Sequence, residues 1–292
     1  MRASAIPSAA ANVLSGFLIA HRSWTPTSDL LLLLVVTCCL YASGMVLNDL
    51  CDVQNDREIA PSRPLPAGQI SSSSARWFYL TLTGLGLMAA AIVGMMSLLI
   101  AACVAVAIVM YDFILKKTVL APIAMGACRF LNVLLGGSTY CQTASGEILG
   151  WPVSLLWFAT SLSIVIVGIT LLAKNENNPI SRSHLNYSAG VIIAGLAGFI
   201  AAPFFCGELN WTSAVYALII IAIGTPPLMK TLRAIKQFDG KQVRMAVIAF
   251  LQSLIFLDAA ACFLVTANLI YPVVVLLLIV PAKFLARTIS PT

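Results

Sequence analysis

Charged residues are scarce in this sequence. Only 10% of its 292 residues are Asp, Glu, Lys or Arg, whereas 60% are apolar. Soluble domains carry about 25% charged residues, so the composition excludes a soluble globular protein and indicates a polytopic membrane protein in contact with the lipid bilayer. We therefore attribute the net charge of +6 to membrane topology and anionic headgroups, and we expect no nucleic-acid partner.

Histidines and paired cysteines are also lacking. The chain has two histidines, and its eight cysteines are scattered without a Cys-x-x-Cys or Cys/His spacing. This pattern argues against a zinc site and a disulfide framework, and the cysteines are best interpreted as reduced packing residues. No Ser/His/Asp or Cys/His catalytic set is expected, because His21 and His184 fall on opposite sides of the membrane in the topology predicted below.

Long apolar runs, in contrast, fill the chain. Because about 20 apolar residues cross the hydrocarbon core, we predict an all-α membrane bundle of ten transmembrane helices, with nine as the alternative. The longest loop, 49–74, is under thirty residues, so residues 1–292 are predicted to form a single integral-membrane domain. The predicted spans are 6–21, 29–48, 75–94, 96–115, 121–140, 151–173, 188–206, 211–231, 243–265 and 268–287.

The distribution of Lys and Arg predicts the orientation. If the N-terminus is cytoplasmic, every basic residue except Arg22 and Arg129 falls in an internal loop or terminus or at its edge. Cytoplasmic loops carry an excess of Lys and Arg. Both termini and the acid-rich loop are therefore predicted to lie on the cytoplasmic side.

An acid cluster follows the second predicted span. Asp49, Asp52 and Asp56 stand at i, i+3 and i+7, so on a continuing helix their carboxylates share one face. Like charges at this distance repel unless a cation lies among them. Mg²⁺ takes one or two carboxylates and completes its shell with water and phosphate oxygens, so these residues are candidate Mg²⁺ ligands. The alternative is a solvated acidic loop without function.

The surroundings of the cluster favour a phosphate ligand. Asn48 adjoins it, and the segment R-P-L-P at 63–66 follows. Arg63 can clamp a diphosphate with two parallel hydrogen bonds. An apolar tail attached to that diphosphate would then lie between the helices.

A second polar patch closes the fourth predicted span. Tyr111 and Asp112 precede Lys116 and Lys117, and the helix that follows carries Arg129 and Asn132, three residues apart and within the membrane. An intramembrane ionisable group is a candidate functional residue. The alternative for Arg129 is a structural pairing with Asp112 or a backbone carbonyl. Gly126, Gly136 and Gly137 are interpreted as residues that allow close helix packing.

These motifs resemble those of the UbiA superfamily of intramembrane prenyltransferases. N-D-x-x-D-x-x-x-D at 48–56, followed by R-P-L-P, is similar to the first aspartate-rich motif of that family, and the 111–117 segment is similar to its tyrosine/lysine segment. The resemblance covers most of the chain. It implies a UbiA-like helical bundle and Mg²⁺-dependent transfer of a prenyl group from a prenyl diphosphate to an acceptor, often aromatic, which the sequence does not identify.

The second acidic motif of that family is altered here. At the end of the sixth span the chain reads K-N-E at 174–176, followed by Asn177 and Asn178. Either Lys174 and Arg182 contact the diphosphate directly, or the site has decayed and the protein is a non-catalytic isoprenoid-binding or transport component. The variant resembles the UbiA-like members of ebo-type gene clusters.

The mechanism that the resemblance implies defines the candidate residues. Mg²⁺ held by the aspartates bridges the diphosphate, basic residues neutralise its charge, and Tyr111 or Tyr140 stabilises an allylic cation with its ring. Asp258 is either a satisfied intramembrane acid or a contact of the acceptor. The candidate catalytic residues are Asp49, Asp52, Asp56 and Lys117, and the candidate substrate-binding residues are Asn48, Arg63, Tyr111, Lys116, Arg129, Asn132, Lys174, Asn175 and Glu176.

Overall fold

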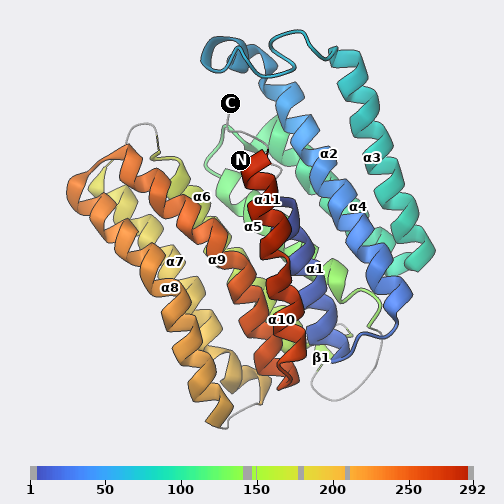
Figure 1. Cartoon of the computed structure of the whole chain (residues 1–292), viewed down its shortest axis with the longest axis vertical. Coiled ribbons are helices and arrows are strands. Elements are labelled where there is room, and N and C mark those ends of the chain that lie inside the picture. Colours follow the sequence, from blue (N-terminus) through green and yellow to red (C-terminus); the bar gives the residue numbers. More distant parts are fainter. Residues whose placement is uncertain (1–4, 141–146, 149, 177–180, 208–210, 289–292) are drawn as a thin grey trace.

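We describe the chain from a computed structural model that covers residues 5–140, 147–148, 150–176, 181–207 and 211–288. In this part of the chain the fold is a helical bundle, as the composition predicts (Figure 1). Its elements are α1 (Ile6–His21), α2 (Thr27–Ile59), α3 (Ser72–Val93), α4 (Met95–Met110), the π-helical turn η2 (Tyr111–Leu115), α5 (Ala121–Gly136), β1 (Glu147–Ile148), β2 (Trp151–Pro152), α6 (Val153–Ala173), α7 (Arg182–Cys206), α8 (Trp211–Gln237), α9 (Gly240–Thr266), α10 (Ile270–Leu277) and α11 (Ile279–Thr288).

Each of the ten predicted spans coincides with a helix or a helix pair. In the described residues, 7 helices are long and apolar enough to cross a membrane, and the fourth of the predicted spans is α4 continued by η2. Three shorter apolar helices complete the set: Ile6–His21, Ala121–Gly136 and Ile270–Leu285. The protein is therefore a multi-pass integral membrane protein. The last predicted span is divided between α10 and α11.

Helix α1 lies in the middle of the bundle. Figure 1 shows α2, α3 and α4 on one side of α1 and α6 to α9 on the other. Every residue of α1 from Pro7 to Ala20 is buried, and the helix contacts α2, α5 and α9. Its composition is weakly hydrophobic because small Ala, Ser and Gly side chains suit close contact with other helices better than contact with lipid.

The crossing of α1 and α5 depends on two glycines. A Cβ atom at Gly136 would lie 2.2 Å from the backbone oxygen of Val13, and one at Gly16 would lie 2.2 Å from that of Val133. Gly126 and Gly137 are similarly close to α6 residues. The predicted packing role of Gly126, Gly136 and Gly137 is confirmed, and the two backbones approach closely enough to bring polar side chains of α1 next to α5.

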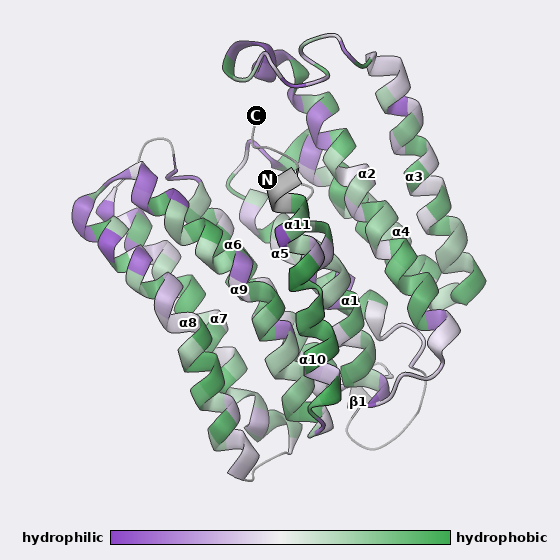
Figure 2. Cartoon of the chain, viewed as in Figure 1, coloured by the Kyte–Doolittle hydropathy of each residue, from purple (hydrophilic) through white to green (hydrophobic). Residues whose placement is uncertain are grey.

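Helix α2 continues far beyond its predicted end. It has 33 residues, or roughly 50 Å at 1.5 Å per residue, so its last turns extend past a hydrocarbon core of about 30 Å. The acid cluster is therefore helical, as its spacing assumed. Hydrophilic residues gather at this end of α2 and, on the opposite side of the bundle, at the α8–α9 turn (Figure 2).

A short hairpin was not predicted. β1 and β2 pair in antiparallel fashion, with Glu147 opposite Pro152 and Ile148 opposite Trp151. β1 lies in the predicted loop between the spans 121–140 and 151–173, whereas β2 takes the first two residues of the predicted span 151–173, so the helix begins only at Val153. Two-residue strands leave no periodic signal in a sequence.

Candidate active site

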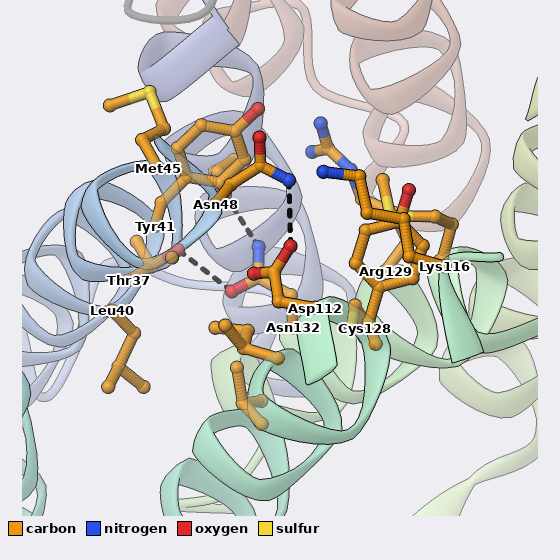
Figure 3. Close-up of a pocket in the computed structure, with 16 residues that line it drawn as sticks. Thr37, Leu40, Tyr41, Met45, Asn48, Asp112, Lys116, Cys128, Arg129 and Asn132 are labelled. Atoms are coloured by element: carbon orange, nitrogen blue, oxygen red, sulfur yellow. Dashed lines mark hydrogen bonds between the residues drawn. The ribbon is translucent and has the colours of Figure 1, made fainter. Parts of the chain in front are cut away.

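A cavity of about 350 Å³ opens between α1, α2, α4, η2 and α5. Its polar lining includes Asn48, Asp112, Lys116, Arg129 and Asn132. Its apolar lining comes from Ala9, Leu40, Gly44, Met45, Val104, Ile108, Met125 and Cys128, with Thr37, Tyr41 and Tyr111 completing the wall. Figure 3 shows Tyr41 and Met45 on one side and Lys116 and Arg129 on the other.

Two aspartates of the acid cluster, Asp52 and Asp56, are paired with basic side chains. Nζ of Lys116 donates a hydrogen bond to Oδ2 of Asp52, and Nη1 of Arg63 donates to Oδ2 of Asp56 at 2.5 Å. Both cations come from the segments that the sequence linked to diphosphate binding. Within the described residues, no group of three or more His, Cys, Asp or Glu side chains converges as a metal site. The assignment of Asp49, Asp52 and Asp56 as metal ligands therefore stays a prediction.

Asn48 joins the first patch to the second. Its Nδ2 donates to Oδ1 of Asp112 at 2.7 Å, and Asp112 is buried. Oδ1 of Asn48 is buried and has no hydrogen-bond partner among the described residues. A buried acceptor without a partner is costly, so this oxygen is well suited to receive a ligand or a metal ion.

The π-helical turn η2 shapes this part of the wall. The amide of Lys116 donates to the carbonyl of Tyr111 at 2.8 Å, the i→i+5 contact of a π-helix. Such turns are frequent at functional sites. Tyr111, Asp112 and Lys116 all line the cavity as a result.

Polar side chains of α5 continue the lining into the bundle. Thr37 donates to Oδ1 of Asn132 at 2.8 Å, and Asn132 donates to the carbonyl of Ala9 at 2.9 Å. Arg129 donates through Nη1 to Oδ1 of Asn12 at 2.5 Å, and its Cζ lies 5.7 Å from the ring centroid of Tyr41. In the described part of the chain Arg129 therefore contacts side chains of α1, and not the Asp112 carboxylate or the backbone carbonyl considered from the sequence.

Asp258 is a satisfied intramembrane acid. It is fully buried, and Nδ2 of Asn12 donates to its two carboxyl oxygens at 3.0 and 2.8 Å. It does not line the cavity, which supports the first of the two interpretations considered from the sequence.

The residues of the altered second motif do not line the cavity. Lys174 donates to the carbonyl of Thr118 at 3.2 Å, beside the turn that carries Lys116. Asn175 is buried, and its Nδ2 lies 3.1 Å from the carbonyl of Leu171 and 3.0 Å from Nδ1 of His184. The amide of Asn175 is therefore engaged at the end of α6. Asn177 and Asn178 lie outside the described residues.

Glu176 lies in the turn after α6. Burial raises the pKa of its carboxyl, and the positive charge of Arg244 acts in the opposite direction. A half-buried carboxyl of this kind is a weaker candidate for metal binding than the α2 aspartates. The binding roles of Lys174, Asn175 and Glu176 stay predictions.

Other predicted residues are also outside the cavity lining: Asp49, Asp52, Asp56 and Arg63 lie beyond its Asn48 end on α2 and the segment after it, and Lys117 and Tyr140 lie elsewhere. Lys117 is exposed and is not part of the lining. Tyr140 packs with its ring against His21, with centroids 5.7 Å apart, near the end of α1 and remote from the acid cluster. Of the two tyrosines considered as cation stabilisers, only Tyr111 therefore borders this cavity.

Sequence reasoning did not single out several lining residues. Thr37, Tyr41 and Met45 lie on α2 one to three turns before Asn48, and their spacing of four residues was the available signal. Asp112 was quoted within its motif but was not chosen as a site residue. Its i, i+4 spacing to Lys116 indicated a shared face.

The sequence and the fold have identifiable relatives. The UbiA prenyltransferase family matches residues 9–254. A digeranylgeranylglyceryl phosphate synthase from Saccharolobus solfataricus is 24% identical over 75% of this chain and 79% of that protein. A synthase of the same name from Methanoculleus marisnigri is 38% identical, over 43% of this chain and 44% of that relative. These relatives do not carry the ebo-type name that the K-N-E variant suggested.

Solved structures share the fold. A digeranylgeranylglyceryl phosphate synthase structure aligns with a TM-score of 0.68 at 20% identity, covering 89% of this chain and 94% of that one. A UbiA homolog from Archaeoglobus fulgidus bound to GPP and Mg²⁺ aligns with a TM-score of 0.66 at 14% identity, covering 91% and 97%. These identities establish the fold alone. Together with the family match, they show that the chain belongs to the UbiA prenyltransferase family and is a membrane prenyltransferase.

Proposed function

We propose that this protein binds a prenyl diphosphate in the cavity between α2, α4 and α5 and transfers the prenyl group to an acceptor that also reaches this cavity. The observation that carries the proposal is the division of one cavity into a charged end with Asn48, Asp112 and Lys116 and an apolar wall with Leu40 and Ile108. A prenyl diphosphate has the same division into a charged head and an apolar tail.

The donor atoms present suit Mg²⁺. Asn48 offers a buried amide oxygen without a hydrogen-bond partner among the described residues, and carboxylates of Asp49 and Asp52 follow it on α2. Hard oxygen ligands with room for phosphate oxygens are what Mg²⁺ requires. We assign the ion to Asp49, Asp52 and Asp56, with Asn48 as a neighbouring oxygen ligand. When bound, Mg²⁺ supplies charge neutralisation for the diphosphate.

Basic residues stabilise the leaving group. Lys116 and Arg63 already contact carboxylates of α2, so both cations are held beside the acid cluster and can exchange a carboxylate for a phosphate oxygen. Preorganised cations of this kind stabilise the charge that develops on the departing diphosphate. Lys174 lies beside the Thr118 turn, which supports the account in which it contacts the diphosphate directly in place of a second acidic motif.

The transfer itself is a substitution at the first carbon of the prenyl group. The bond from this carbon to oxygen breaks, and its electron pair leaves with the diphosphate. An acceptor nucleophile forms the new bond, and for a hydroxyl acceptor the proton passes to the diphosphate. The apolar wall excludes water from the allylic cation, and the Tyr111 ring borders the cavity where it can stabilise positive charge.

The names of the relatives suggest both substrates. Digeranylgeranylglyceryl phosphate synthases add a geranylgeranyl group to a glyceryl phosphate acceptor. We propose the same classes here: geranylgeranyl diphosphate as donor and a prenylated glyceryl phosphate as acceptor. The ebo-type subgroup stays the alternative, since it rests on the K-N-E segment at 174–176, and its acceptor is unidentified.

We further propose that both termini and the acid-rich end of α2 face the cytoplasm and that residues 1–292 form one domain. The positions of Lys and Arg support this orientation.

Product analysis tests the proposed substrates. Purified protein in nanodiscs is incubated with Mg²⁺, prenyl diphosphates of different lengths, and either geranylgeranylglyceryl phosphate or an aromatic acceptor. We expect mass spectrometry to detect the digeranylgeranyl product. Transfer only to the aromatic acceptor would reject the proposed acceptor and keep the enzyme class.

A further inference from the structure

Arg129 carries a charge inside the bundle that its neighbours only partly satisfy. A guanidinium has five N–H groups. Nη1 donates to Asn12 at 2.5 Å and lies 3.5 Å from Oγ of Ser8. Among the described residues this guanidinium makes no further hydrogen bond, and no carboxylate lies within 4.0 Å of it. Nε and Nη2 therefore remain available to a ligand.

Asn12 connects Arg129 to a buried acid. Its Oδ1 accepts from Arg129, while its Nδ2 donates to Asp258 at 2.8 and 3.0 Å. Because the oxygen of an amide accepts and its nitrogen donates, the side chain of Asn12 can satisfy both partners in one orientation only. The contacts link three helices, with Arg129 on α5, Asn12 on α1 and Asp258 on α9. These hydrogen bonds hold the guanidinium at Nη1, and among the described residues they leave the edge formed by Nε and Nη2 free.

The Arg129 side chain borders the cavity. Arg129 lines it together with Lys116 (Figure 3), and its Cζ lies 5.7 Å from the centroid of the Tyr41 ring. Side chains of a helix incline toward its N-terminus, so Arg129 extends toward the start of α5, the end that follows Lys116. The Cα atom of Arg129 lies eight residues after Ala121, which is roughly 12 Å along the axis of α5.

The position of Arg129 differs from that of the cations beside the acid cluster. Lys116 and Arg63 contact Asp52 and Asp56, whereas Arg129 contacts neither. A charged side chain within the membrane is unfavourable unless it has a partner. An anionic second substrate would supply that partner.

We propose that Asp258 acts through Asn12 to position Arg129, and that the free edge of Arg129 binds the phosphate of the acceptor. Arg129 is then a substrate-binding residue, and Asn12 and Asp258 are positioning residues. The inference rests on the proposed function and specifies its acceptor site. A guanidinium suits phosphate because two N–H groups match two phosphate oxygens.

The test separates acceptor binding from donor binding. Transfer is measured with geranylgeranyl diphosphate as donor and with two acceptors, geranylgeranylglyceryl phosphate and the same ether without its phosphate. We expect Arg129→Met to raise the acceptor KM for the phosphate compound by about tenfold or more, with the donor KM unchanged. The neutral acceptor should show the same KM in both proteins.

Two positioning variants and two controls complete the set. Asn12→Leu and Asp258→Leu should raise the same acceptor KM, whereas Asp258→Asn retains an acceptor oxygen for Asn12 and should behave like the wild type. Ser15→Ala is the matched control on α1, because among the described residues the hydroxyl of Ser15 donates to the carbonyl of Ala11 within its own helix. If the leucine variants do not fold, Arg129→Met and Asp258→Asn still decide the outcome.

Two results would overturn the inference. One is a raised donor KM with an unchanged acceptor KM in Arg129→Met, and the other is an equal loss for the charged and neutral acceptors. If the wild type transfers nothing, the proposed function fails, and thermal stabilisation by each acceptor alone then tests the inference. Stabilisation by the phosphate compound alone, lost in Arg129→Met, supports it; equal stabilisation of both proteins rejects it.

Discussion

Lys116 and Lys117 are neighbours in the chain with different surroundings. Lys116 lines the cavity and contacts Asp52, whereas Lys117 is exposed. The sequence predicted a catalytic Lys117 and a substrate-binding Lys116, and the cavity favours Lys116 for the leaving group. The π-helical turn places Lys116 in the cavity wall, and a two-residue K-K pair does not reveal which side chain turns inward.

We expect Lys116→Met to lower kcat for diphosphate release by about 10²-fold, the usual effect of removing one group that stabilises developing charge. Lys117→Met, its matched control, should retain most of the activity. Steady-state kinetics in nanodiscs measures both. An equal loss of kcat in the two variants would show that Lys117 contributes as much as Lys116, and it would contradict the different roles inferred from the cavity lining.

Glu176 gives a pH-dependent prediction. Its pKa is raised by burial, with Arg244 opposing, so the folded protein holds this proton more tightly than the unfolded chain. The stability associated with Glu176 is then fully present below the unfolded pKa and is lost as pH rises through the folded pKa. Glu176→Gln should therefore be at least as stable as the wild type at neutral pH.

Thermal unfolding of the two proteins from about pH 4 to about pH 7 measures this difference, which should shrink as pH falls. A wild type that gains stability relative to Glu176→Gln as pH rises would contradict the assignment. The same variant tests the second motif: loss of transfer at unchanged stability would show that Glu176 takes part in the reaction.

At the scale of elements, α1 shows what a hydropathy pattern measures. The predicted span 6–21 is rich in small Ala, Ser and Gly side chains, yet it is buried from Pro7 to Ala20. The low hydropathy of this segment is explained by its position: α1 contacts other helices and not lipid. The polar partners Asn12 and Asp258 are 246 residues apart in the chain, so no local pattern reveals their contact, whereas the i, i+3, i+7 spacing on α2 predicted the acid cluster directly.

The α1–α5 crossing gives an element-scale prediction. Gly136→Ala would place a methyl group against the backbone of Val13, and overpacking of this kind costs about 1–3 kcal/mol. We expect a lower thermal midpoint and weaker transfer, because the crossing also sets Asn12 against Arg129. Gly84→Ala on α3 has open space around its Cβ and is the control.

Size-exclusion chromatography after heating, with residual activity, measures both glycine variants. If Gly136→Ala tolerates heat as well as Gly84→Ala does, the close approach of α1 and α5 is not a determinant of stability.

At the scale of the whole molecule, composition and apolar runs were sufficient to predict a multi-pass helical bundle. Composition and apolar runs did not predict the cavity, because its wall combines residues from five elements. Figure 2 shows the hydrophilic residues concentrated where α2 and the α8–α9 turn end. This polarity agrees with one strongly charged membrane face.

Topology is tested with C-terminal fusions. The predicted cytoplasmic C-terminus should give a fluorescent green fluorescent protein fusion and an inactive alkaline phosphatase fusion, since the latter needs an oxidising compartment for its disulfides. The opposite pair of results would place the C-terminus outside and contradict the predicted orientation; with a cytoplasmic N-terminus it would require an odd number of spans.

Diphosphate release by the wild type and Asp52→Ala, with Mg²⁺ or EDTA, tests the central claim most directly. The protein is supplied with geranylgeranyl diphosphate and geranylgeranylglyceryl phosphate in nanodiscs. We predict Mg²⁺-dependent release by the wild type, and release at least about 10²-fold slower in Asp52→Ala at unchanged thermal stability. Equal turnover in the two proteins, or turnover unaffected by EDTA, would contradict a prenyl diphosphate site built on the aspartates of α2.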